Sequence, residues 1–384
     1  MNRPIYLDHH ATTPLAPEVL EVMMPYLTNH FGNASSSEHA FGWRAEEAVE
    51  LARSQVASLV GCTPHEIIFT SGATEANNLG IRGVAEAYAK RGGHLVTQAT
   101  EHAAVLDVCR DLEAKGHPLT VLPVDQLGTV MTDDLTAALR DDTVLVSIMG
   151  ANNEVGTVQP FEELSELTTN AGAIFHCDMA QMLGRCRLDL SKSKIGLASF
   201  SAHKLYGPKG VGALYVSRRN PRVVLSPQQV GGGHERGWRS GTLNVPGIVG
   251  FGAACVLAAE LLDQEADRQR RLANQLVDEV SQGLDGACIV HGSRKARLPG
   301  NVSFGFEGVD GEKLLLALAE LAVSSGAACA SAKQAPSHVL AAMGVPVGLA
   351  QATLRVGLGR STTEANILFA AERIVSVVKE LRDA

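Results

Sequence analysis

Between residues 67 and 216 the sequence alternates repeatedly between short apolar segments and longer segments with helical character. The short segments have the length and apolarity of buried strands, and they span residues 67–70, 94–98, 120–124, 144–149, 174–178, 197–201 and 212–216. Because neighbouring parallel strands need a crossover connection, usually a helix, this order predicts a mostly parallel seven-stranded sheet covered by helices. The expected fold class is therefore α/β.

The pattern changes after about residue 258. Residues 260–283 are typical of one long charged helix, and the later segments alternate less regularly: strands are expected at 288–291, 302–306 and 353–357, and an apolar helix at 312–321. A chain of 384 residues suits two domains. We expect a large domain over residues 15–258, and a smaller α+β domain made of residues 1–14 and 259–384.

Charge and cysteine content narrow the class of protein further. The chain has 33 basic and 41 acidic residues, so its net charge of −8 argues against a nucleic-acid partner or an anionic membrane surface. The longest uncharged apolar stretch, residues 247–259, is shorter than the roughly 20 residues of a membrane-spanning helix. The seven cysteines are odd in number and contain no CxxC pair, which indicates a reducing cytoplasm and neither disulfides nor a zinc site.

Lys204 is the first residue that can carry chemistry. It follows an apolar segment and precedes a Gly/Pro turn, with a serine, a histidine and apolar residues beside it. Partial burial lowers the pKa of a lysine and favours its covalent attachment to a carbonyl group. A solvated loop lysine is the alternative, and Lys204 alone does not decide between the two.

Two further segments suit a phosphorylated cofactor. Residues 71–77 follow an expected strand, where Gly72 permits a tight turn and a new helix would offer free N–H groups, beside the Thr74 hydroxyl, to a phosphate. Asp178 ends another expected strand, where it could pair with the ring nitrogen of pyridoxal phosphate (PLP), while Gln181 could donate to the ring's phenolate. Ordinary helix N-caps are the alternative for both segments.

Taken together, these segments resemble the cysteine desulfurases, PLP enzymes of the class V aminotransferase group with fold type I. The resemblance runs from residue 6 to residue 360 and rests on Tyr6-Leu7-Asp8, Ala11-Thr12-Thr13-Pro14, residues 69–75, Thr100-Glu101-His102, residues 152–156, Ser201-Ala202-His203-Lys204, residues 231–237, residues 239–242 and Ser324-Ser325-Gly326-Ala327-Ala328-Cys329. The last segment has the form of the NifS/IscS-type subgroup. Ala34 and Ala327 stand where the family more often has Pro and Ser, which leaves substrate detail open.

The resemblance implies a role for each matching residue. Lys204 and Cys329 would be catalytic, with His102 stacked on the PLP ring and acting as acid or base. The cofactor would be held by Ala73, Thr74, Asn153, Asp178, Gln181, Ser201 and His203, with Thr242 supplied by the second subunit of a homodimer. Asn153 and Arg355 would bind the substrate carboxylate. An internal salt bridge is the alternative for Arg355, and a surface loop position is the alternative for His102.

Cys329 would define the activity. It lies among small residues, where a mobile, exposed thiol could become thiolate and attack the sulfur of L-cysteine. The expected products are L-alanine and a persulfide on Cys329, which passes to a protein acceptor such as an Fe–S scaffold or a thiolation protein. Selenocysteine lyase, cysteine or cystine C–S lyase, plain aminotransferase and catalytically silent sulfur-transfer partner are the alternatives. No metal is expected, because no second cluster completes a site with Asp8-His9-His10.

Overall fold

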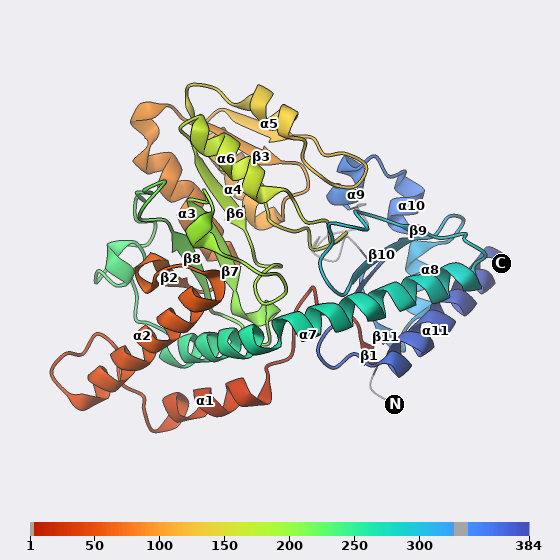
Figure 1. Ribbon diagram of the computed structural model, residues 1–384, viewed down its shortest axis with the longest axis horizontal. Coiled ribbons are helices and arrows are strands. Elements are labelled where there is room, and N and C mark those ends of the chain that lie inside the picture. The colour runs from red at the N-terminus through yellow and green to blue at the C-terminus, as the bar shows by residue number, and fades with distance from the viewer. Residues whose placement is uncertain (1–3, 326–336, 384) are drawn as a thin grey trace.

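A seven-stranded sheet forms the centre of the computed structural model, which describes residues 4–325 and 337–383 (Figure 1). The strand order is β2-β8-β7-β6-β5-β3-β4; β8 is antiparallel to both of its neighbours, and the other pairs are parallel. The strands are β2 (Ile67–Thr70), β3 (His94–Gln98), β4 (Leu119–Leu122), β5 (Thr143–Ser147), β6 (Ile174–Asp178), β7 (Leu197–Ser201) and β8 (Gly212–Val216). The mostly parallel sheet expected from the sequence is confirmed.

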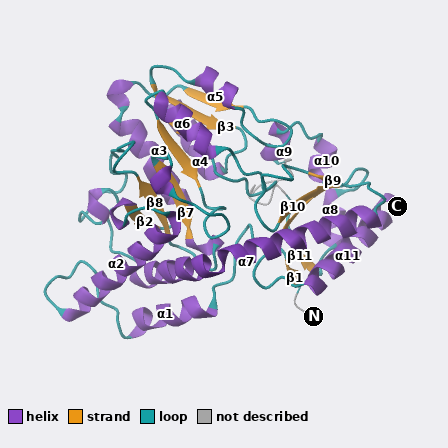
Figure 2. Ribbon diagram, viewed as in Figure 1, coloured by secondary structure: helices purple, strands orange, loops and turns teal. Residues whose placement is uncertain are grey.

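Both faces of this sheet are buried, and consecutive strand residues serve opposite faces. Leu95 packs in one core cluster and Val96 in the other, as do Ile174 and Phe175. The helices α3 (Ala73–Ala87) and α4 (Ala103–Ala114) contribute to the first cluster. The second cluster includes residues of α1 (Pro17–Thr28), α2 (Ala40–Val60), α5 (Thr132–Ala138), α6 (Phe161–Asn170) and α7 (Val245–Gly283) (Figure 2).

The helix α7 starts earlier than the sequence predicted. A helix was expected over residues 260–283, but α7 begins at Val245 and runs without interruption through residue 258. Its first turns contain glycines, which argue against a helix by propensity; here they permit close packing, since a Cβ at residue 252 would lie 2.7 Å from the Cα of Ala52. The division into domains at residue 258 therefore stays a prediction.

By length and apolar composition α7 resembles a membrane span, but it is a core helix. Ile248, Phe251 and Cys255 are buried in the cluster beside the sheet. Leu272 and Leu276, further along, pack in a different cluster. Figure 1 shows α7 running from α1 and α2 at one end to the C-terminal elements at the other.

The C-terminal part contains a smaller antiparallel sheet with its own core. Its strand order is β12-β10-β9, and β1 pairs with β11 beside it. Leu7, near the N-terminus, packs in this core with Phe304, Leu354 and Ile374. The elements are β1 (Ile5–Tyr6), β9 (Ile289–Val290), β10 (Asn301–Gly305), α8 (Gly311–Ala317), β11 (Leu321–Ala322), α9 (His338–Ala342), α10 (Val347–Gln351), β12 (Thr353–Gly357) and α11 (Glu364–Asp383).

One expected helix in this part is wrong at its end. The apolar run 312–321 predicted a single helix, but α8 stops at Ala317, and Leu321 pairs with Ile5 in the short parallel sheet. The apolar run cannot distinguish these outcomes, because its last residues are buried by a strand from the opposite end of the chain. The consequence is that β1 brings the N-terminal segment beside the C-terminal sheet.

Candidate active site

A cavity of about 690 Å³ opens where the carboxyl ends of the central strands meet the C-terminal part. In α/β folds ligands bind at this edge of the sheet. The cavity is lined by ten of the residues that the sequence singled out: Ala73, Thr74, His102, Asn153, Asp178, Gln181, Ser201, His203, Lys204 and Arg355. Asp8 and His10 also line it, so the N-terminal segment contributes to the wall of the cavity together with Arg355 on β12.

The turn between β2 and α3 has the features of an anion cradle. Gly72 adopts a φ of 152° and precedes α3 without a side-chain cap, so the first N–H groups of this helix are available to a ligand. A Cβ at residue 212 would lie 2.6 Å from the Cα of Gly72, so the glycine at 212 lets β8 approach this turn closely. The Ser201 hydroxyl lies across the cradle, 3.9 Å from the position of a Cβ on Gly72.

Asp178 is fixed at the end of β6 by two donors. Asn77 Nδ2 donates to Asp178 Oδ2 at 2.8 Å, and the backbone N–H of Ala180 donates to Oδ1 at 3.0 Å. The carboxylate therefore accepts a hydrogen bond within the turn that follows β6 and also lines the cavity; residues 180–185 form turns, so Asp178 is not the N-cap of a helix. Asn77 holds Asp178 from α3, a contact between residues 101 apart that no local pattern in the sequence indicates.

Lys204 lies on the short helical turn Ala202–Lys204 directly after β7. Its side chain is half-buried, and Nζ donates to the backbone oxygens of His10 and Ala11, both at 2.7 Å. The neighbouring His203 is hydrogen-bonded to Thr12, with 3.1 Å between His203 Nδ1 and Thr12 Oγ1. Burial, together with Lys204, lowers the pKa of His203 to about 4, so its imidazole is neutral at neutral pH.

His102 lines the cavity at the start of α4, and a backbone contact determines which of its ring nitrogens carries the proton. Its Nδ1 accepts a hydrogen bond from the backbone N–H of Ala104 at 3.1 Å, which leaves the ring proton of the neutral form on Nε2. Burial lowers the pKa of His102, although the charge of Asp178 opposes the effect. Glu101 is buried behind it, and burial together with Asp178 raises the pKa of that carboxyl well above its ordinary value.

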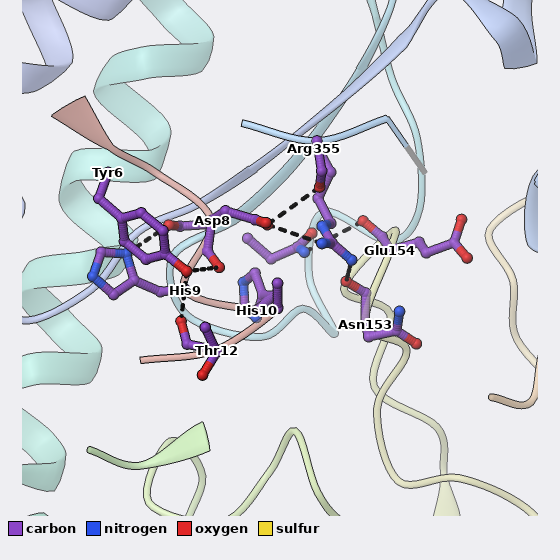
Figure 3. Close-up of polar contacts among 12 residues, drawn as sticks. Tyr6, Asp8, His9, His10, Thr12, Asn153, Glu154 and Arg355 are labelled. Carbon is purple, nitrogen blue, oxygen red and sulfur yellow. Dashed lines mark hydrogen bonds and ion pairs between the residues drawn. The ribbon is translucent and has the colours of Figure 1, made fainter. Parts of the chain in front are cut away.

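Arg355 on β12 faces the cavity and is almost completely buried. Its Nη2 donates to Asp8 Oδ1 at 2.9 Å and its Nη1 to the backbone oxygen of Asn153 at 3.3 Å (Figure 3). The internal salt bridge named as the alternative for Arg355 is therefore present. Asp8 lines the cavity and pairs with Arg355, but it was not among the expected site residues, although it lies in one of the matching segments. The sequence shows an acidic residue in the first of those segments, but it does not show its partner, because Arg355 lies 347 residues away.

Cys329 lies outside the described residues. Thr242 is exposed and is not among the residues that line the cavity, so its expected contribution to a second subunit stays a prediction. None of the six cysteines in the described ranges lines the cavity either.

The residues of the cavity fit PLP. The uncapped start of α3 with Ser201 and His203 offers donors to a phosphate, and the fixed acid Asp178 lines the same cavity as Lys204. The cations Lys204, Lys209 and Arg355 match the negative charges of a phosphate and a carboxylate. This is the donor set that the cofactor requires.

Comparison with known proteins gives the family. The aminotransferase class-V family matches residues 5–368. Cysteine desulfurase IscS of Anaeromyxobacter sp. (strain Fw109-5) is 53% identical over 383 residues, which covers 100% of this chain and 94% of that protein. A solved structure titled NifS-like protein is 36% identical with a TM-score of 0.91, covering 99% of this chain and all of that one. SspA in complex with cysteine is 35% identical with a TM-score of 0.81, covering 92% and 98%.

The chain therefore belongs to the aminotransferase class-V family. Within it, the expected resemblance to the cysteine desulfurases and the expected PLP fold type I are both confirmed.

Proposed function

We propose that this chain is a PLP-dependent cysteine desulfurase that converts L-cysteine to L-alanine and leaves the sulfur as a persulfide on Cys329. The observation that carries the proposal is the convergence of Lys204, Asp178, the cradle at Gly72 and Arg355 on one cavity. Relatives of this chain are named for the same activity, and a solved neighbour holds cysteine.

Most of the expected site residues in the cavity have a task toward the cofactor. When bound, PLP supplies an electron sink that stabilises negative charge at the substrate's α-carbon. Asp178 would keep the ring nitrogen protonated, and Gln181 would hold the phenolate oxygen. Ala73, Thr74, Ser201 and His203 would hold the phosphate, Asn153 would contact the cofactor from its loop, and His102 would stack on the ring.

Proton movement falls to Lys204 and His102. Lys204 Nζ would take the proton from the α-carbon, since two backbone oxygens hold it at the cavity wall. Because burial lowers the pKa of His102, its imidazole is neutral and carries its proton on Nε2. It can therefore donate a hydrogen bond without adding charge beside Asp178. Arg355 and Asn153 would hold the substrate's carboxylate.

The sulfur step requires a thiolate near the cavity. The Cys329 thiolate would attack the substrate sulfur; the S–S bond forms, the C–S bond breaks, and its electron pair stays with the carbon fragment, which takes up a proton and leaves as alanine. None of the six cysteines in the described ranges lines the cavity, and burial raises the pKa of Cys109 to about 12 and that of Cys177 well above its ordinary value. The described residues on the two sides of Cys329 have partners near the cavity. The Ser324 hydroxyl donates to Asp8, and the Ser337 hydroxyl donates to Glu154.

The proposal includes a homodimer and a protein acceptor in the cytoplasm. Large apolar side chains are exposed between the end of α1 and the start of α2, among them Phe31 with 70% and Trp43 with 55% of its surface accessible. An apolar surface of this kind suits a second copy of the chain, which would also receive Thr242. Sedimentation should give twice the chain mass, and Phe31→Glu should shift the protein toward the monomer.

The decisive experiment incubates the PLP-loaded protein with L-cysteine and a thiol reductant and quantifies alanine, sulfide and pyruvate. We expect equal amounts of alanine and sulfide, both lost in Cys329→Ala while PLP absorbance is retained. Cys288→Ala is the matched control, since Cys288 contacts Ser281 away from the cavity. Pyruvate that survives the loss of Cys329 would instead identify a C–S lyase.

A further inference from the structure

The ion pair between Asp8 and Arg355 differs from an ordinary surface pair. The Arg355 side chain is 3% exposed and that of Asp8 18%, and both residues line the cavity (Figure 3). A guanidinium this deeply buried requires an anion when no substrate carboxylate is present, because an unpaired buried charge is strongly destabilising. Asp8 provides that anion.

The backbone of Asp8 is attached to the strand that carries Arg355. Residue 8 forms a parallel bridge with Gly357, the N–H of Gly357 donates to Leu7 at 2.7 Å, and the N–H of His9 donates to Gly357 at 3.0 Å. Gly357 lies two residues after Arg355 on β12. The backbone of Asp8 therefore cannot move away from β12 without breaking main-chain hydrogen bonds, which keeps its carboxylate within reach of Arg355.

The carboxylate of Asp8 is itself oriented. Its Oδ1 accepts from Arg355 Nη2 and also from the hydroxyl of Ser324 at 3.2 Å. Ser324 is paired with Arg355 by two main-chain hydrogen bonds, of 2.7 Å and 3.3 Å, on the edge of β12 opposite β10. One oxygen thus joins the N-terminal segment, β12 and the segment that follows β11.

The guanidinium of Arg355 is held at both ends. Asp8 fixes Nη2, and the backbone oxygen of Asn153 fixes Nη1. An arginine held in this way keeps its plane and its remaining N–H groups in one orientation, so less conformational entropy is lost when a carboxylate binds. Asp178, which also lines this cavity, takes its hydrogen bonds from Asn77 and Ala180 instead.

We propose that Asp8 is a positioning residue that fixes the Arg355 guanidinium for the carboxylate of the amino-acid substrate. The inference rests on the proposed function, in which Arg355 binds that carboxylate. Asp8 takes no part in the chemistry. It acts on how tightly a carboxylate is bound, and it has no effect on ligands that lack one.

The test measures the dissociation constant of two probes on the PLP-loaded enzyme by titration calorimetry. L-Alanine carries the α-carboxylate and ethylamine does not. Asp8→Asn keeps the shape and removes the charge, and we expect it to weaken L-alanine binding about tenfold while ethylamine changes by less than about twofold. An equal loss for both probes, or no loss for L-alanine, would overturn the positioning role.

A double-mutant cycle separates this inference from the proposed function. Arg355→Lys should weaken L-alanine binding, and Asp8→Asn should then add less than about twofold in the Arg355→Lys background. If Asp8→Asn costs the same factor in both backgrounds, Asp8 does not act through Arg355 and the inference fails. If Arg355→Lys alone leaves binding unchanged, the role of Arg355 in the proposed function fails instead.

Ser324→Ala covers the case in which Asp8→Asn does not fold. It removes one of the two donors that orient Asp8 Oδ1 and leaves the ion pair in place. We expect L-alanine binding to weaken about two- to threefold, with ethylamine unaffected. Unchanged binding of L-alanine in this variant would count against the inference.

Discussion

Two buried arginine–carboxylate pairs in this protein use the same chemistry for different ends. Arg53 on α2 meets Glu235 through two parallel hydrogen bonds of 2.7 and 2.8 Å, and the side chains are 4% and 1% exposed. Arg355 meets Asp8 through one nitrogen and lines a cavity, and its Nε has no partner among the described residues. The first pair is complete in itself, whereas the second leaves donors for a ligand.

The surroundings of the two pairs reinforce the contrast. Glu235 also accepts from the N–H of Phe69, and Arg53 also donates to the backbone oxygen of Ile67, so the pair joins the loop around residue 235 to β2. Glu235 has a φ of 47°, a conformation that side chains rarely adopt, which this fully bonded pair can maintain. A satisfied pair stabilises a fold, and an incompletely satisfied pair beside a cavity indicates a binding site.

The largest expected loss of stability comes from a substitution at Arg53. Arg53→Met leaves the Glu235 carboxylate buried without its cation, and we expect the free energy of unfolding to fall by about 3–5 kcal/mol. Urea denaturation followed by circular dichroism measures this loss. The double variant Arg53→Met with Glu235→Leu should recover part of it, because no charge is then left buried; a double variant as unstable as the single one would contradict the assignment.

The second effect is the stability cost at Asp8, which should be smaller. Asp8→Asn leaves Arg355 without its anion, but the site borders a cavity that water can enter, so we expect a loss of about 1–2 kcal/mol in urea denaturation. Added L-alanine should restore stability less in this variant than in the wild type. A loss as large as that of Arg53→Met would mean that the two pairs do not differ in kind.

The stability of the protein should also depend on pH, through the buried carboxyl of Glu154 near Arg355. Burial raises the pKa of Glu154 to about 7 from an ordinary value of 4.5, although Ser337 and Arg355 oppose the effect. Because the folded protein binds this proton more tightly than the unfolded chain, the stability from Glu154 is complete below about pH 4.5 and is lost as the pH rises to about 7. Urea denaturation between pH 4.5 and 8 should show Glu154→Gln gaining on the wild type over that window; a constant difference would exclude the shift.

The smallest expected effect is at Tyr6. Its hydroxyl donates to the backbone oxygens of Asp8 and Thr12 at 3.1 and 2.9 Å, and its side chain is partly exposed. Tyr6→Phe should lower the free energy of unfolding by less than about 1 kcal/mol and change the L-alanine dissociation constant by less than about twofold. A tenfold change in binding would show that the tyrosine, and not the ion pair, positions Asp8.

The sequence predicts the central sheet well because its strands are buried on both faces. Apolar runs such as residues 174–178 and 197–201 have few alternatives in a chain with this alternation, and both were observed at the expected bounds. The start of α7 was missed because glycine lowers helix propensity, while the close approach of α2 that makes those glycines favourable is visible only in the fold.

For the site, motifs indicate residues but not their partners. Lys204, Asp178 and Arg355 were expected, and all three line the cavity. That Asn77 holds Asp178, and that Asp8 holds Arg355, depends on segments brought together from 101 and 347 residues apart. No periodicity or spacing within one segment carries that information. The expected chemistry of Cys329 lies outside the described residues and stays a prediction.

The continuity of α7 has a mechanical consequence. A helix of 39 residues is about 58 Å long. Between residues 253 and 282 it contains neither glycine nor proline, so it forms a stiff connection between the two cores. A tilt of about one degree at one end moves the other by about 1 Å, a misplacement that can slow a reaction on the order of a hundredfold. Lys204 follows β7 of the central sheet and Arg355 lies on β12 of the C-terminal sheet, and both line the cavity. The stiffness of the helix that joins the two cores therefore limits how far these residues can shift relative to each other.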